Sequence, residues 1–230
     1  MRQINIIFFG APGAGKGTQA KKISFELNLP HIDTGSLIRE AITHQTELGT
    51  KAQNFVEAGK LVPDQLVIDL IREKLIVLKG KNFKGFILDG YPRTIPQANA
   101  LQTLLEELNL ELTCVINIQA PEDILIKRLS SRRICSNKNC GEIYNLLTKK
   151  PKATGKCDLC GSNLYQRKDD TEEASKERLQ EYHNKTAPLE KYYRDKNKLV
   201  DMDGTEDSEE VYKKIIRAVV KRNTSDEICQ

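Results

Sequence analysis

Gly10-Ala-Pro-Gly-Ala-Gly-Lys-Gly-Thr18 is a glycine-rich loop near the start of the chain, and it decides the fold. The segment before it, Ile4-Asn-Ile-Ile-Phe-Phe9, is short, apolar and rich in β-branched and aromatic residues, which predicts a buried strand. The apolar pattern from Thr18 to Leu29 predicts a helix after it. A strand, a glycine loop and a helix start form a phosphate cradle, because glycines let several N–H groups point at one anion.

One position departs from the general phosphate-loop pattern G-x-x-x-x-G-K-[ST]. Gly10, Gly15 and Lys16 fit the pattern, and Lys16 supplies a mobile positive charge for the β- and γ-phosphates. Gly17, however, stands where a metal-binding hydroxyl is usual, and Thr18 follows it. The alternative is a glycine-rich turn with a solvated lysine, which the flanking strand and helix disfavour. We therefore expect a nucleoside phosphate to bind here.

The composition predicts a water-soluble protein with a mild positive charge. At 230 residues the chain can bury a good core. Its net charge of +4 is explained by arginines at a phosphate site as well as by nucleic-acid binding. No apolar run approaches the roughly 20 residues of a membrane span, and the one at Ile4 is too short for a signal peptide. We expect a cytoplasmic protein.

A second strand is predicted at Gly85-Phe-Ile-Leu-Asp89, and it ends in a carboxylate. In phosphate-loop enzymes such an aspartate holds Mg²⁺, or the water around it, beside the phosphates. Arg93 follows closely enough to clamp a phosphate with two hydrogen bonds. Gln97, one turn further on, offers a donor and an acceptor to the edge of a base.

Residues 34–63 are predicted to form a small helical flap between elements of the core. Ser36 is placed to cap a helix that runs to about residue 44, and Arg39 lies one turn into it. A second helical stretch covers 50–58 and ends at Gly59, a usual C-terminal stop. Further helices are predicted at 64–78, 97–108, 172–184 and 208–222, and another begins at Pro121 and carries Ile124, Leu125 and Leu129. Further strands are predicted at 112–118 and 198–202.

Two cysteine pairs lie in residues 134–170, a stretch poor in apolar residues. Cys135-x4-Cys140 and Cys157-x2-Cys160 present four thiolates at spacings typical of tetrahedral zinc sites. Disulfide bonds are the alternative, which a reducing compartment disfavours. Four cysteines leave no open position on zinc, so we interpret the metal as structural and as a substitute for the core that this lobe lacks.

The motifs, in this order and spacing, resemble those of adenylate kinases of the long, zinc-bearing bacterial type over nearly the whole chain. The residues that carry the resemblance are Gly10–Thr18, Thr34-Gly35 with Arg39, Leu88-Asp-Gly-Tyr-Pro-Arg93 with Gln97, Arg132-Arg133, Arg167-Lys-Asp-Asp170 and Arg178-Leu-x-Glu-Tyr-His183.

The resemblance implies an α/β phosphate-loop fold of the nucleoside-monophosphate kinases, with a parallel sheet flanked by helices. It implies a core made of 1–33, 64–130 and 171–230, a nucleoside-monophosphate lobe at 34–63 and a zinc-bearing lid at 131–170. The implied activity is reversible transfer of the γ-phosphoryl group of ATP to AMP, giving two ADP. The implied cofactors are Mg²⁺ and structural Zn²⁺, and we expect a monomer. A cis bond between Tyr91 and Pro92 is implied as well.

The resemblance also assigns residues to each role. It implies a catalytic set of Lys16, Asp89, Arg93, Arg128, Arg132, Arg167 and Arg178. It implies that ATP is bound by Gly13, Ala14, Gly15, Lys16, Gly17, Thr18, Arg128 and Arg132. It implies that AMP is bound by Thr34, Arg39, Val62, Gly90, Arg93, Gln97, Arg167 and Arg178.

The chain departs from the family pattern at two places. Family members often carry an acid after Thr-Gly, where this chain has Ser36, so we expect Asp89 to do more of the metal organisation. The first cysteine pair has a spacing of four residues where two is common, so we expect a looser zinc knuckle that still binds.

Three other functions compete with this interpretation. A kinase for another nucleoside monophosphate shares the core motifs, although Thr34 and Gln97 favour adenine. A GTPase needs Asn-Lys-x-Asp, and the nearest run, Asn197-Lys-Leu-Val-Asp201, is one residue too long. A nucleic-acid-binding zinc protein is favoured only by the basic stretch Lys149-Lys-Pro-Lys152.

Overall fold

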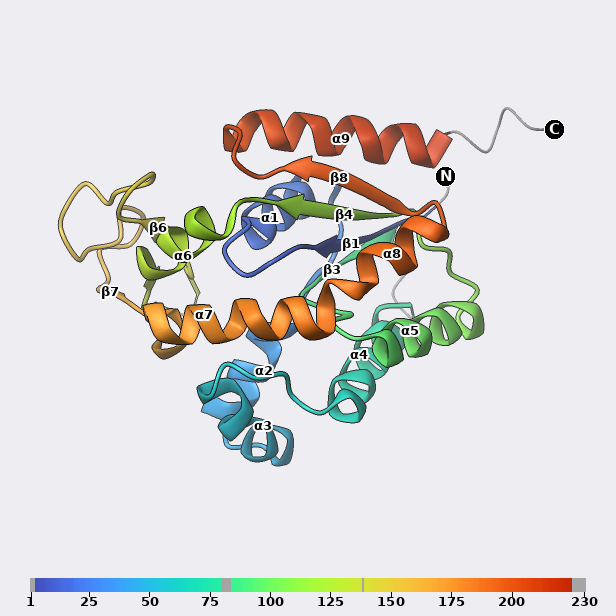
Figure 1. Ribbon diagram of the computed structural model, residues 1–230, viewed down its shortest axis with the longest axis horizontal. Helices are drawn as coiled ribbons and strands as arrows, with labels where there is room; N and C mark the ends of the chain where they lie inside the picture. Colours follow the sequence, from blue (N-terminus) through green and yellow to red (C-terminus); the bar gives the residue numbers. More distant parts are fainter. Residues whose placement is uncertain (1–2, 80–83, 138, 225–230) are drawn as a thin grey trace.

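A parallel sheet forms the centre of the computed structural model, which describes residues 3–79, 84–137 and 139–224 (Figure 1). Its strands are β1 (Ile4–Phe9), β2 (His31–Asp33), β3 (Gly85–Asp89), β4 (Cys114–Gln119) and β8 (Leu199–Asp203). Within the described residues the order is β2-β3-β1-β4-β8, and all four pairings are parallel. Strands β1, β3 and β4 are almost wholly buried, which explains their continuous apolar sequences. The predicted α/β fold is confirmed.

Helices pack around this sheet in two groups. Helix α1 (Lys16–Leu27) packs against α9 (Ser208–Thr224), and both contact strands of the sheet. Helices α4 (Asp64–Lys79), α5 (Ile95–Glu107) and α8 (Pro188–Asp195) pack against one another in series. The core holds mainly Ile, Leu, Val and Phe side chains from the strands and from these helices. No described helix is both long enough and apolar enough to cross a membrane.

The helical pair α2 (Thr34–Thr43) and α3 (Glu47–Glu57) lies at the lower edge of Figure 1, and α2 contacts β2 and β3 of the sheet. The prediction that Ser36 caps the first of these helices is wrong. Asp33 is the N-cap of α2, and its carboxylate accepts a hydrogen bond from the Ser36 N–H. Helix α3 begins before residue 50 because Thr46 caps it, and Gly59 ends the segment at a φ of +70°.

A small antiparallel sheet follows α6 (Glu122–Ser130). It has the order β6-β5-β7 and consists of β5 (Arg132–Cys135), β6 (Ile143–Asn145) and β7 (Leu164–Tyr165). The described residues of this lobe bury a small apolar cluster of Cys135, Tyr144 and Cys157. A lobe with so small an apolar core needs another source of stability.

The chain returns to the core through the short 3₁₀ turn η1 (Lys168–Asp170) and α7 (Glu172–Glu181). The helix predicted to reach residue 184 changes to a π-helical turn at Tyr182–Thr186, a feature that often marks functional sites. In this turn the Thr186 hydroxyl donates a hydrogen bond of 2.8 Å to the carbonyl oxygen of Arg93. The Tyr91–Pro92 bond is cis, as the resemblance implies.

Candidate active site

A large cavity opens at the carboxyl ends of the parallel strands, the usual ligand position in α/β sheets. Its volume is about 1150 Å³, and it extends from the glycine-rich loop to the α2/α3 pair and the small sheet. Every residue predicted to bind a nucleotide or to act in catalysis lines it: Gly13, Ala14, Gly15, Lys16, Gly17, Thr18, Thr34, Arg39, Val62, Asp89, Gly90, Arg93, Gln97, Arg128, Arg132, Arg167 and Arg178.

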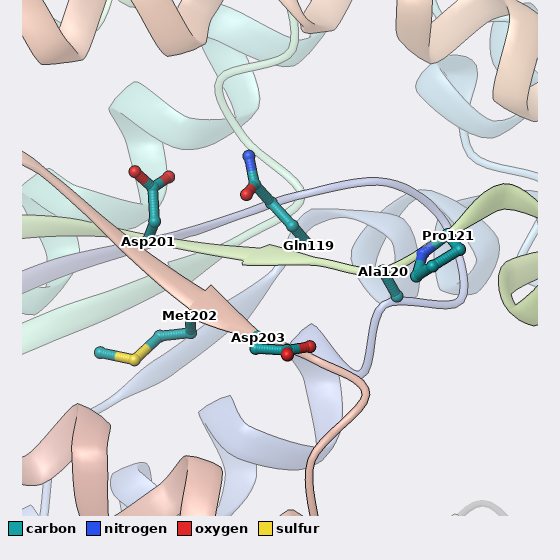
Figure 2. A pocket seen from close by; sticks show the side chains of 6 residues that line it. All are labelled: Gln119, Ala120, Pro121, Asp201, Met202 and Asp203. Atoms are coloured by element: carbon teal, nitrogen blue, oxygen red, sulfur yellow. The ribbon is translucent and has the colours of Figure 1, made fainter.

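Figure 2 shows a second, smaller pocket at the ends of β4 and β8. It measures about 400 Å³ and is lined by Gln119, Ala120, Pro121, Asp201, Met202 and Asp203. One of its carboxylates is already occupied, because Asp201 accepts a hydrogen bond from Asn117 and pairs with Arg194. None of the predicted site residues lies here, so the large cavity is the candidate active site.

The glycine-rich loop wraps tightly at the end of β1. Gly10 has a φ of +132°, and a Cβ atom there would lie 2.2 Å from the carbonyl oxygen of Ile118. Gly15 precedes the first turn of α1 with a φ of +100°. Since side chains would clash or be strained at these positions, only glycine lets the backbone bring its N–H groups round one anion. Helix α1 then presents its N-terminus to the same space.

Lys16 lies inside this loop. Its Nζ donates hydrogen bonds to the carbonyl oxygens of Gly10 (2.7 Å) and Ala11 (2.9 Å). Burial lowers its pKa from 10.5 to about 8, although the nearby charge of Asp89 acts in the opposite direction. A phosphate at the loop would therefore stabilise the charged ammonium group.

Two aspartates stand at the ends of neighbouring strands. Asp33 and Asp89 are register partners in β2 and β3, so both carboxylates belong to the same edge of the sheet, and both line the cavity. His31 also lines the cavity, with Nε2 3.5 Å from Oδ2 of Asp89. Neither Asp33 nor His31 is predicted as a site residue. The signal available in the sequence was the position of Asp33 directly before Thr34-Gly35.

Two acidic residues hold the arginine cluster together. Asp170 is fully buried and accepts hydrogen bonds from Nε of Arg132 (2.8 Å) and Nη1 of Arg178 (3.0 Å). Asp169 forms a two-point pair with Arg167. Burial acts to raise the pKa of Asp169, but Arg167 and Arg178 outweigh it and lower the pKa to about 2. Three arginines from separate segments are thus fixed at one wall of the cavity.

Arg93 and Gln97 also line the cavity. Arg93 Nε donates to the carbonyl oxygen of Gly90 (2.7 Å), and burial lowers the pKa of the guanidinium. The Gln97 amide accepts from Arg93 N (2.8 Å) and donates to Asp64 (2.7 Å). The hydroxyl Oγ1 of Thr34, in contrast, is buried without a hydrogen-bond partner among the described residues. An unsatisfied buried hydroxyl at a cavity wall is suited to a polar ligand.

The four cysteine sulfurs of the predicted zinc site lie within 4.8 Å of one another. The sulfurs of Cys135 and Cys160 are 3.4 Å apart, and those of Cys140 and Cys157 are 3.7 Å apart. These sulfurs are unbonded, since a disulfide has a length of about 2.05 Å. Zinc–sulfur bonds of about 2.3 Å in a tetrahedron place sulfurs about 3.8 Å apart. The cluster therefore fits a single zinc ion.

A loop beyond the predicted residues also reaches the cavity. Gly204-Thr205-Glu206-Asp207 joins β8 to α9 and lines the side nearest the glycine-rich loop. Gln19 of α1 connects the two, donating from Nε2 to the Ser208 carbonyl oxygen at 2.9 Å. The signal for this loop was a strand followed by Asp-Gly-Thr and a helix, which places the turn at the carboxyl edge of the sheet.

The family match and the relatives found by comparison with known proteins agree on one family. The family described as adenylate kinase matches residues 8–198. An adenylate kinase of Archaeoglobus fulgidus is 50% identical over 212 residues, which are 92% of this chain and 96% of that protein. The adenylate kinase of Thermosipho melanesiensis is 48% identical over 94% of this chain and 99% of its own length. That of Methanocella arvoryzae is 49% identical over 95% and 99%.

Proposed function

Since the chain belongs to the adenylate kinase family, we propose that its large cavity binds ATP and AMP together and brings the γ-phosphoryl group in line with the acceptor phosphate. The protein is a phosphotransferase, an adenylate kinase that converts ATP and AMP reversibly into two ADP. The observation that carries the proposal is the convergence of all the predicted residues on one cavity, although they come from segments far apart in the sequence.

The donor side is proposed to be the glycine-rich loop. Gly13–Thr18 supply N–H groups to the ATP phosphates, and Lys16 neutralises their charge. Arg128, Arg132, Arg167 and Arg178 surround the transferring group. Phosphoryl transfer spreads negative charge over the equatorial oxygens, and fixed arginines stabilise that charge without reorganising during the reaction. No strong base is required for this chemistry.

The acceptor side is proposed to be the wall between α2 and β3. Arg39 and Arg93 bind the AMP phosphate from two directions. Thr34 faces the base with its unpartnered hydroxyl, supported by Val62 and Gly90. Gln97 contributes in part through Arg93, since its amide accepts from the Arg93 N–H. In this arrangement the adenine is read mainly by hydrogen bonding at a buried wall.

Asp89 is the proposed magnesium-organising carboxylate. It is buried at the end of β3, faces the cavity and lies near Lys16. Mg²⁺ bound with ATP supplies charge neutralisation and a fixed phosphate geometry. Asp89 would hold it through water, because Gly17 provides no hydroxyl at the usual position. His31 lies beside the same carboxylate, with Nε2 3.5 Å from Oδ2 of Asp89.

We propose that three structural units surround the reacting groups: the core, the lobe at 34–63 and the lid at 131–170. Structural zinc in the cysteine cluster would stabilise the lid, which closes over both substrates and excludes water. Cys140 and Gly141 line the cavity, so the proposed metal site borders the cavity. We propose that the protein acts as a monomer in the cytoplasm, where its unbonded cysteines remain available to zinc.

The products of the reaction test this function. ATP and AMP incubated with Mg²⁺ should give two ADP for each AMP consumed, as followed by ³¹P NMR, and ATP alone should be stable. Lys16→Met should lower kcat at least 100-fold, since the transition-state charge loses its partner, while circular dichroism shows an unchanged fold. Phosphate release without AMP, or near-normal turnover of the variant, would contradict the proposal.

A further inference from the structure

The first turn of α2 holds Arg39 through a directed chain of hydrogen bonds. Ser36 Oγ donates to the Asp33 carboxylate and accepts from Nη2 of Arg39 at 3.0 Å. The direct distance from Nη2 of Arg39 to the Asp33 carboxylate is 3.7 Å, which is too long for a hydrogen bond. The Ser36 hydroxyl therefore bridges the two charges. Because it has one proton, its donation to Asp33 leaves its lone pairs for the arginine.

Gly35 forms the floor beneath the same guanidinium. A Cβ atom at this position would lie 2.9 Å from Nη1 of Arg39 and 3.3 Å from Oδ1 of Asp33. Gly35 lies within α2 and has no left-handed φ, so backbone strain does not require a glycine here. The glycine instead provides space, which lets the guanidinium lie close against the helix backbone.

Arg39 differs from Arg132 and Arg167 in how many hydrogen bonds its guanidinium group makes. Arg167 makes a two-point pair with Asp169, and Arg132 makes one with Asp170. Among the described residues, the hydrogen bond found for the Arg39 guanidinium is the single one to Ser36. Its side chain lines the cavity and is 35% exposed. Nη1 and Nε are consequently free for a ligand.

We propose that Asp33, Gly35 and Ser36 form a positioning seat that aims Arg39 at the acceptor phosphate and so sets the affinity for the nucleoside monophosphate. This inference rests on the proposed function, which assigns Arg39 to that phosphate. Ser36 then has a defined part: Asp33, one turn earlier, supplies the carboxylate, and Ser36 keeps the guanidinium from turning onto it.

Removal of the Ser36 hydroxyl should let the Arg39 side chain rearrange. Without the Ser36 hydroxyl, Arg39 is free to form a two-point pair with Asp33, as Arg167 does with Asp169. Two of its donors would then be taken by Asp33 and would no longer be free for a ligand. The donor site is unaffected, because its residues lie on the glycine-rich loop and on the arginine wall.

Two variants separate this role from simple helix stability. Ser36→Ala should raise KM for AMP about tenfold, the size expected for one charge-assisted hydrogen bond, and leave KM for ATP within about twofold. Gly35→Ala should also raise KM for AMP, because the new methyl group displaces Nη1. The same change should raise Tm or leave it unchanged, since alanine is the better helix former. If Gly35 only stabilised the helix, its substitution could not raise KM for AMP while Tm stays unchanged or rises.

Thr46→Ala is the matched control in the same lobe. Thr46 caps α3 through a hydrogen bond from Gly49 N (3.1 Å) and does not line the cavity. Loss of this cap should lower Tm and leave KM for AMP unchanged. If Thr46→Ala raised KM for AMP as much as Ser36→Ala did, the effect would belong to lobe stability and the seat would be refuted.

Arg39→Ala completes the test as a double-mutant cycle. If Ser36 acts through Arg39, Ser36→Ala should add nothing to KM for AMP in the Arg39→Ala background. A full additional effect would overturn the inference and leave the proposed function standing, as would a normal KM for AMP in both Ser36→Ala and Gly35→Ala. A normal KM in Arg39→Ala would instead refute the phosphate role of Arg39, and the seat with it.

Discussion

Lys16 shows how one side chain can be tuned by its surroundings. Burial in the glycine-rich loop lowers its pKa to about 8, so an increasing fraction of the ligand-free protein loses this charge as the pH rises through 8. We expect kcat/KM for ATP to fall above pH 8. The decrease in kcat should occur at a higher pH than the decrease in kcat/KM, because phosphates bound beside Lys16 favour its ammonium form.

The lowered pKa of Lys16 affects folding stability in the opposite direction: stability rises with pH where kcat/KM falls. Between pH 8 and the ordinary value of 10.5, the unfolded chain binds more protons at this lysine than the folded chain does. This group therefore adds stability as the pH rises through that window. In Lys16→Arg the side chain stays charged, so the alkaline limb of kcat/KM should disappear. A constant kcat/KM for ATP from pH 7 to pH 10 in the unaltered enzyme would contradict the assignment of Lys16 to the phosphates.

Residues with a fixed motif could be predicted from the sequence, and residues that act by proximity could not. Lys16, Asp89 and Arg93 belong to short patterns whose chemistry is local. Asp33 looked like an ordinary strand-end residue, and its importance appears only when the register with β3 and the position of Arg39 are known. His31 was missed for the same reason, because its partner Asp89 is distant in the sequence.

At the scale of elements, apolar runs identified the strands β1, β3, β4 and β8 of the large sheet. The ends of the helices were harder to predict, because capping hydrogen bonds determine where a helix begins and ends. The Asp33 carboxylate begins α2 earlier than a Ser36 cap would, and the π-helical turn at Tyr182–Thr186 ends α7 before residue 184. The strands β2, β5, β6 and β7 are too short for any periodic signal.

The cysteine cluster makes a prediction about the small sheet. The unaltered protein, purified without chelator, should contain about one zinc per chain. Cys157→Ser should lower that content and speed hydrogen exchange in β5 and β6 before it affects β1, since this lobe has little core of its own. Zinc analysis and hydrogen exchange measured on the same sample would test both effects.

Cys114→Ala is the control for this experiment. Cys114 is fully buried in β4 and lies outside the cluster, so its loss should destabilise the core and leave the zinc content unchanged. Absence of zinc from the unaltered protein, or equal loss of zinc in both variants, would contradict a zinc site made of four cysteines.

At the scale of the molecule, the cavity exists because distant segments meet. Helix α3 approaches the η1 turn, with Lys168 Nζ 3.9 Å from Glu57, and Glu181 of α7 accepts a hydrogen bond from Leu61 N at 3.4 Å. The segment that contains α2 and α3 therefore touches η1 and α7 at the edge of the site. Such contacts follow from tertiary packing and have no sequence signature.

The most direct test of the central claim is the choice of acceptor. With saturating Mg-ATP, initial rates should be measured against AMP, GMP, CMP and UMP at matched concentrations. We predict that kcat/KM for AMP exceeds that for each other monophosphate at least 100-fold, because a buried polar wall rejects a base that leaves its groups unpaired. Equal or faster phosphorylation of GMP, CMP or UMP would contradict the account.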